Sequence, residues 1–100
     1  MLQKIEILSK LKELKPTYEN EGLILLGVFG SYARDTQNSF SDIDIAYKLD
    51  YDKFSQKYKD GFSKILRIDD IKEELQQTFK TKIDFVPDNN KDILKDIIYV

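Results

Sequence analysis

Residues 23–47 read LILLGVFGSYARDTQNSFSDIDIAY, and the arrangement of the whole chain follows from this stretch. Its first part, residues 23–29, is a short apolar run typical of a strand buried on both faces, and a Gly-Ser pair ends it. Residues 42–47 then alternate carboxylate and apolar side chains, which predicts a second strand with one face toward the core. Since Asp42 and Asp44 are two residues apart, both carboxylates are expected on the same face.

The flanking segments carry the spacing of amphipathic helices. Apolar residues recur every three or four positions over residues 2–15, and Pro16 is expected to end that helix. Residues 51–79 show the same spacing, and Asp60-Gly61 is expected to divide them into a short helix and a longer one. An apolar stripe predicts a terminal helix, capped by Asn89 or Asn90, that contains Ile93, Leu94, Ile97 and Ile98.

A third strand is predicted over residues 82–86, where the alternation returns before Pro87. Ile83 and Phe85 are expected to face the core, which places Asp84 on the opposite face. The order helix, strand, strand, helix, strand, helix predicts a single α/β (α+β) domain over residues 1–100. Its expected architecture is a small mixed β-sheet flanked by helices.

Composition excludes several kinds of chemistry. The 100 residues include no Cys and no His, so thiol catalysis, Ser–His–Asp hydrolysis and zinc hydrolysis are ruled out. A formal net charge of −2 argues against direct nucleic-acid binding and against an anionic membrane surface. The longest apolar run is far shorter than the roughly 20 residues of a membrane span, so a cytoplasmic protein is expected.

Asp42 and Asp44 bring two negative charges onto one face of a strand, where aspartate is uncommon. At a separation of ~6.6 Å and an effective dielectric constant of ~20, their repulsion is about 2.5 kcal/mol. A magnesium ion offsets such repulsion, because it prefers carboxylate and phosphate oxygens. The alternative is that both carboxylates are simply hydrated on a solvent-facing strand.

The pair Gly30-Ser31 gives a second indication of a site. A glycine at the end of a buried strand lets the backbone approach a ligand, and a helix that starts there would aim free N–H groups at an anion. The alternative is a strand-ending turn whose serine caps a helix. Together with the two aspartates, this turn predicts a site for a metal-bound triphosphate.

The segment Gly-Ser-Tyr-Ala-Arg at 30–34, followed by Ser-Asp-Ile-Asp-Ile at 41–45, resembles the nucleotidyltransferase signature of the DNA polymerase beta superfamily. Gly-Ser, ten residues and Asp-x-Asp match it without a gap. Ala33-Arg34 and Ser41 narrow the resemblance to the minimal nucleotidyltransferases (MNT), the MntA-like antitoxins of HEPN/MNT toxin–antitoxin pairs. Asp35 stands where that family commonly has glycine.

The resemblance implies a polymerase-beta-like fold, ATP as substrate and a two-metal Mg²⁺ site. It implies that Gly30 and Ser31 hold the β- and γ-phosphates, and that the catalytic and metal-binding carboxylates are Asp42, Asp44 and Asp84. Arg34 has two interpretations, because it could contact nucleotide phosphates or pair with Asp35 or a strand carboxylate. The remaining candidate carboxylates fall in helical patterns, where they are expected to cap or solvate helices: Asp69, Asp70, Asp92 and Asp96.

The expected function is that of an antitoxin that transfers AMP from ATP to a hydroxyl group, a tyrosine by implication, of a HEPN toxin and so silences it. A chain this short has no room for a separate acceptor-binding domain, so the acceptor is expected on another protein. One alternative is a non-catalytic antitoxin that blocks its partner by covering it. Another is a small-molecule nucleotidyltransferase, to which the missing second domain is the main objection.

Overall fold

The computed structural model describes residues 2–38, 41–89 and 91–100. The elements in chain order are α1 (Lys4–Glu19), β1 (Leu23–Phe29), α2 (Gly30–Ala33), β2 (Ile43–Leu49), α3 (Tyr51–Lys57), α4 (Gly61–Phe79), β3 (Ile83–Pro87) and β4 (Ile98–Tyr99). No helix among these described residues is both long and apolar enough to cross a membrane.

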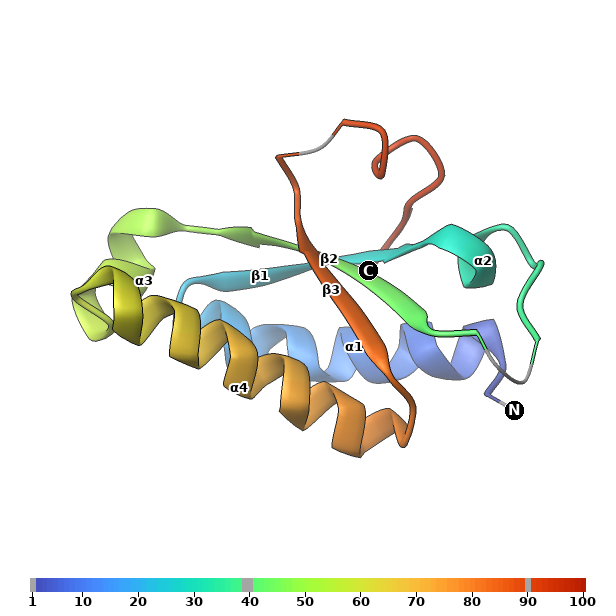
Figure 1. Ribbon diagram of the computed structural model, residues 1–100, viewed down its shortest axis with the longest axis horizontal. Helices are drawn as coiled ribbons and strands as arrows, with labels where there is room; N and C mark the ends of the chain where they lie inside the picture. The colour runs from blue at the N-terminus through green and yellow to red at the C-terminus, as the bar shows by residue number, and fades with distance from the viewer. Residues whose placement is uncertain (1, 39–40, 90) are drawn as a thin grey trace.

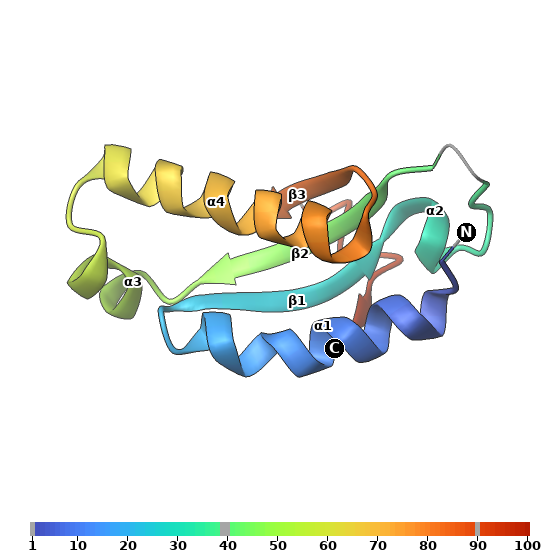
Figure 2. The same ribbon diagram turned by 90° about the horizontal axis from the view of Figure 1, so that it is seen from below.

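The four strands form one mixed sheet in the order β3-β2-β1-β4. β1 pairs antiparallel with β2 and with β4, whereas β2 and β3 are parallel. A parallel pair needs a long crossover, and α3 and α4 provide it. Figures 1 and 2 show α1 and α4 on one face of the sheet, while the segment between β3 and β4 rises from the other. The predicted small mixed sheet flanked by helices is confirmed.

The hydrophobic core lies between the sheet and the two long helices. Alternate residues of the strands point into it, as the sequence pattern predicted, and α1 and α4 cover them with apolar stripes. Its largest fully buried side chains are Ile7, Leu11, Leu23, Leu25, Val28, Ile43, Ile45, Phe54, Ile71, Leu75 and Ile83. The opposite face of the sheet is therefore free to carry polar groups.

Two of the helix predictions meet different outcomes. The division of residues 51–79 is confirmed, because Asp60 caps α4 by accepting a 2.7 Å hydrogen bond from the Ser63 backbone N–H. The prediction that Pro16 ends the first helix is wrong, since α1 continues to Glu19. Tyr18 is buried beyond the proline, and its hydroxyl donates a 2.8 Å hydrogen bond to α4, so tertiary contacts stabilise this last turn.

The predicted terminal helix is wrong. The described residues from 91 to 96 form turns and bends, and the chain then enters β4, which pairs with β1 at Gly27 and Val28. Asn89 lies in a turn rather than at a helix cap, and Asn90 lies outside the described residues. Pairing with β1 is possible because Gly27 has no Cβ, which would otherwise overlap the carbonyl oxygen of Ile98.

We expect Gly27→Ala to lower the free energy of unfolding by about 2–3 kcal/mol, because the new methyl group must displace the backbone of β4. The matched control is Gly61→Ala at the first turn of α4, where a Cβ meets nothing within 4 Å. That variant should match or slightly exceed wild-type stability. Urea unfolding measures both, and equal stability of the two variants would contradict the close contact between β1 and β4.

Candidate functional site

Strand register places two predicted site residues side by side. Asp44 on β2 lies opposite Phe29 on β1 and opposite Asp84 on β3. A 3.0 Å hydrogen bond from the Ile43 N–H to the Lys82 carbonyl oxygen helps to hold this alignment. Residues paired across a sheet point to the same face, so both carboxylates lie on the face opposite the core. The prediction that Asp84 faces away from the core side is thereby confirmed.

Burial and neighbouring negative charges destabilise the ionised form of the Asp44 carboxyl. Burial raises its pKa to about 6, and the charge of Asp84, a side-chain hydrogen bond with Asp84 and the charge of Asp42 act in the same direction. The charge of Arg34 opposes this shift. Two carboxyl groups that share a hydrogen bond cannot both be ionised without repulsion. The Asp44–Asp84 pair therefore favours a proton or a cation between its oxygens.

Asp42 lies just before β2 and is exposed. Ser41 shapes the approach to it, because the Ser41 Oγ accepts a 2.9 Å hydrogen bond from the Asn38 N–H. Asp42 acts on Asp44 through charge. Within residues 2–38, 41–89 and 91–100, no group of three or more His, Cys, Asp or Glu is arranged to hold a metal ion.

The donor set nevertheless suits magnesium, which is usually bound by one or two protein carboxylates together with water and substrate phosphates. Asp44 and Asp84 supply the hard carboxylate oxygens in direct contact, and the pair is stressed when both are charged. Ligation by Asp42 remains a prediction.

Gly30 joins the glycine–serine turn to the carboxylate pair. It begins α2 with φ of 74°, in the left-handed region that favours glycine, and a Cβ there would overlap Oδ2 of Asp44. Ser31 follows at once in the first turn of α2, whose backbone N–H groups have no partner within the helix. The expected proximity of the turn to Asp44 is confirmed, and only glycine permits this approach.

The loop after α2 shows how aspartate is accommodated at position 35, where the minimal nucleotidyltransferases commonly have glycine. Asp35 has φ of 58°, so this position requires the left-handed conformation that glycine adopts freely and aspartate tolerates. Its carboxylate pairs with Lys4 Nζ at 3.0 Å, and the Thr36 N–H donates a 2.9 Å hydrogen bond to the Ser31 carbonyl oxygen. The loop can therefore form without the family glycine.

The suggested pairing of Arg34 with Asp35 is wrong, because the Arg34 guanidinium pairs with Asp96 at 3.5 Å. Asp96 and Asp92 do not lie on a helix, which corrects that prediction, whereas Asp69 and Asp70 are exposed on α4 as expected. No pattern in the sequence singles out Asp96, since it is 62 residues from Arg34 and only the position of β4 brings it near.

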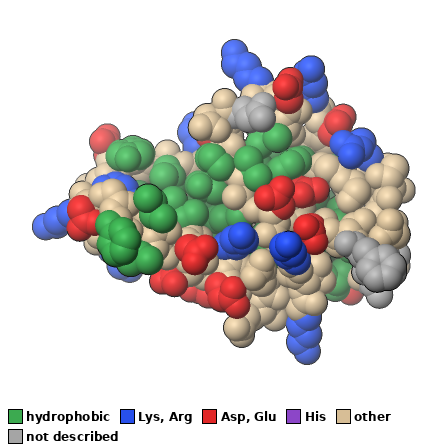
Figure 3. All heavy atoms as spheres, viewed as in Figure 1, with side chains coloured by type: hydrophobic (Ala, Val, Ile, Leu, Met, Phe, Trp, Pro, Cys, Tyr) green, Lys and Arg blue, Asp and Glu red, His purple; other side chains and the backbone are tan. Residues whose placement is uncertain are grey.

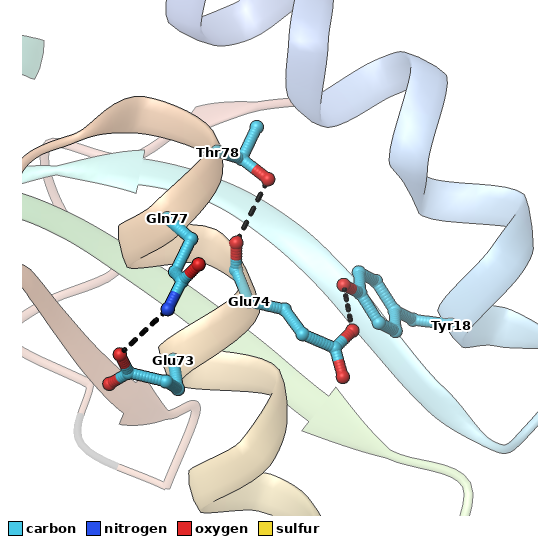
Figure 4. A pocket seen from close by; sticks show the side chains of 5 residues that line it. All are labelled: Tyr18, Glu73, Glu74, Gln77 and Thr78. Carbon is cyan, nitrogen blue, oxygen red and sulfur yellow. Dashed lines mark hydrogen bonds between the residues drawn. The ribbon is translucent and has the colours of Figure 1, made fainter.

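A pocket of about 510 Å³ lies elsewhere, between α1 and α4. Its lining residues are Tyr18, Glu73, Glu74, Gln77 and Thr78. Figure 4 shows their polar groups bonded to one another, with the Tyr18 hydroxyl donating to Glu74. None of these residues belongs to the carboxylate site, and the Tyr18–Glu74 hydrogen bond joins the two helices beside this pocket.

Charge on the face seen in Figure 3 is mixed. Lysine and arginine side chains alternate there with aspartate and glutamate, and hydrophobic side chains gather between them. The described residues on this face therefore form no continuous basic surface of the kind that binds a nucleic-acid backbone.

The pKa of Asp44 predicts a pH-dependent stability. Folding raises this pKa from 3.8 to about 6, so the folded state binds more protons than the unfolded state, and stability falls as pH rises through that window. We expect Asp44→Asn to be more stable than wild type by about 1–2 kcal/mol at pH 8 without magnesium, allowing for solvent screening. This advantage should shrink toward pH 4.

Urea unfolding at pH 4, 6 and 8 measures this effect, with Asp69→Asn on the exposed face of α4 as the control. An equal advantage for Asp44→Asn at all three pH values would show that its charge is not the cause.

Comparison with known proteins agrees with this geometry. The family described as "Polymerase beta, Nucleotidyltransferase" matches residues 9–99. The chain is also 32% identical over 103 aligned positions to a curated protein of Methanocaldococcus jannaschii named "Putative protein adenylyltransferase MJ0126", with 95% of this chain and 92% of the relative covered. The match spans the Gly30 turn, Asp42, Asp44 and Asp84, and the chain belongs to the polymerase beta nucleotidyltransferase family.

Proposed function

We propose that this nucleotidyltransferase transfers AMP from ATP to a hydroxyl group on a partner protein, with magnesium as cofactor. The observation that carries the proposal is the contact of the Gly30 turn with Asp44, which in turn contacts Asp84. This arrangement puts N–H donors for phosphate beside carboxylates suited to a cation. The name of the Methanocaldococcus jannaschii relative supports a protein as the acceptor.

Each residue has a distinct role in this reaction. Gly30 and Ser31 bind the β- and γ-phosphates through the first turn of α2. Asp42 and Asp44 would hold magnesium, and Asp84 would complete a second metal site; the cation would supply neutralisation of phosphate charge and make the acceptor hydroxyl easier to deprotonate. The acceptor oxygen forms a bond to the α-phosphorus, the bond from that phosphorus to the departing pyrophosphate breaks in line, and the hydroxyl proton passes to a water molecule beside Asp84.

The acceptor that we propose is a tyrosine of a HEPN-type toxin, which AMP transfer would silence in the cytoplasm. The support is indirect. Residues 9–99 match the nucleotidyltransferase family, so nearly the whole of this chain is accounted for by the catalytic fold. We propose that another molecule brings the acceptor hydroxyl, and the resemblance to MNT antitoxins supports a HEPN-type toxin in that role.

A second candidate is neutralisation by binding alone. Phe62, Ile65 and Leu66 follow one another at helical spacing on α4, and they are exposed by 72%, 65% and 50%. Exposed apolar side chains in one patch commonly mark a protein-binding surface. Such a surface would bind either a partner protein that receives AMP or a partner protein that is blocked by binding alone.

The decisive experiment mixes the purified chain with its HEPN partner, ATP and magnesium, followed by intact-mass measurement. We expect the partner to gain the mass of AMP and to lose toxicity. Asp42→Asn with Asp44→Asn should reduce transfer by at least about 10³-fold, because the triphosphate loses its cation. Neutralisation that survives in this double variant, with no mass gain in wild type, would instead establish binding alone.

A second prediction concerns Gly30→Ala, whose methyl group must push the Asp44 carboxylate away and strain the backbone. We expect transfer by the folded protein to fall by at least about 10-fold. Gly22→Ala is the matched control, because Gly22 also has a positive φ of 99° and would meet the backbone of Phe54 far from the site. It should cost stability but leave the activity of the folded fraction unchanged. Equal loss of activity in both variants would contradict a specific role for Gly30.

A further inference from the structure

Asp96 approaches the site from the segment between β3 and β4. β4 starts two residues later, at the edge of the sheet, and pairs with Gly27 and Val28 near the C-terminal end of β1. Because Gly27 lacks a Cβ, the backbone of β4 lies close against β1. This contact carries Asp96 to the C-terminal end of α2, where its Oδ2 lies 3.5 Å from the Nη1 atom of Arg34.

This ion pair is poorly suited to a structural task. Both side chains are 55% exposed, and exposed pairs of this kind add little to folding stability. The position of the Arg34 guanidinium relative to the carboxylates of the candidate site is more informative. The charge of Arg34 also acts on Asp44, so the guanidinium lies within electrostatic range of both Asp96 and the Asp44–Asp84 pair.

The guanidinium keeps donors for a ligand. It carries five N–H donors in a planar fork, and the ion pair with Asp96 engages Nη1. Such a fork binds phosphate oxygens through two parallel hydrogen bonds when its orientation is set in advance. Arg34 follows α2 directly, and α2 begins with the Gly30-Ser31 turn.

We propose that Asp96 is a positioning residue, which orients the Arg34 guanidinium so that its remaining N–H groups contact the triphosphate bound at the Gly30 turn. The inference rests on the proposed function and extends it to a residue of the β3–β4 segment. Asp96 itself carries a negative charge and would repel a triphosphate. Its removal therefore weakens nucleotide binding only if orientation of Arg34 outweighs that repulsion.

The test is calorimetric titration of the full chain with the magnesium complex of α,β-methylene-ATP, which needs no acceptor. We expect Asp96→Asn to weaken binding by about 3- to 10-fold and Asp96→Glu to stay within about twofold of wild type. Asp96→Asn should have no further effect in an Arg34→Gln background, because the two residues act as a unit. Its urea unfolding midpoint should equal that of wild type.

The control Asp92→Asn removes the same charge from the same segment, where Asp92 pairs with Lys95 at 3.5 Å, and should bind the nucleotide as wild type does. Unchanged or tighter binding by Asp96→Asn, or an equal loss in the Arg34→Gln background, would overturn the role of Asp96 alone. Failure of the wild-type chain to bind the nucleotide would overturn the proposed function and this inference together.

Discussion

The approach of the Gly30 backbone to the Asp44 carboxylate is the contact on which the site depends. It requires a residue without a Cβ and with a positive φ at the end of β1, and it requires β1 and β2 to pair so that Phe29 lies opposite Asp44. The parallel pairing of β2 with β3 then adds Asp84 to the same row. One glycine and two strand registers thus bring the Gly30-Ser31 turn together with Asp44 and Asp84.

The same contact costs stability. Asp44 is partly buried beside another carboxyl group, which raises its pKa to about 6, so its ionised form is less stable in the folded protein than in water. A cation accompanied by phosphates relieves that cost, because it replaces the repulsion between carboxylates by attraction. Ionisable groups with shifted pKa values are common at functional sites.

The helical side of the sheet carries a cluster of ion pairs and hydrogen bonds around Glu21. The mostly buried guanidinium of Arg67 donates to Glu21 at 2.8 Å and to Glu74 at 2.9 Å, and the hydroxyl of Tyr58 also donates to Glu21. These bonds join the turn before β1 to α4 and to the residue that follows α3. A cluster in which every polar group has a hydrogen-bond partner stabilises a unique packing. This cluster therefore fixes α4 against the side of the sheet opposite the carboxylates.

The pattern of apolar and polar residues along the chain was sufficient to predict most helices and strands and the sheet face that carries Asp44 and Asp84. The reason is that alternation and helical spacing reflect which side of each element is buried. The pattern was sufficient for the position of Gly30 as well, since a residue without a Cβ is needed beside Asp44, whereas the role of Ser31 stays a prediction. It failed for the terminal segment, whose apolar spacing suits a helix in isolation but which pairs with β1 where Gly27 leaves room. It also failed for the partner of Arg34. Contacts such as Arg34–Asp96 join residues far apart in the chain, and they depend on how strands pair in space, which periodicity along the chain does not encode.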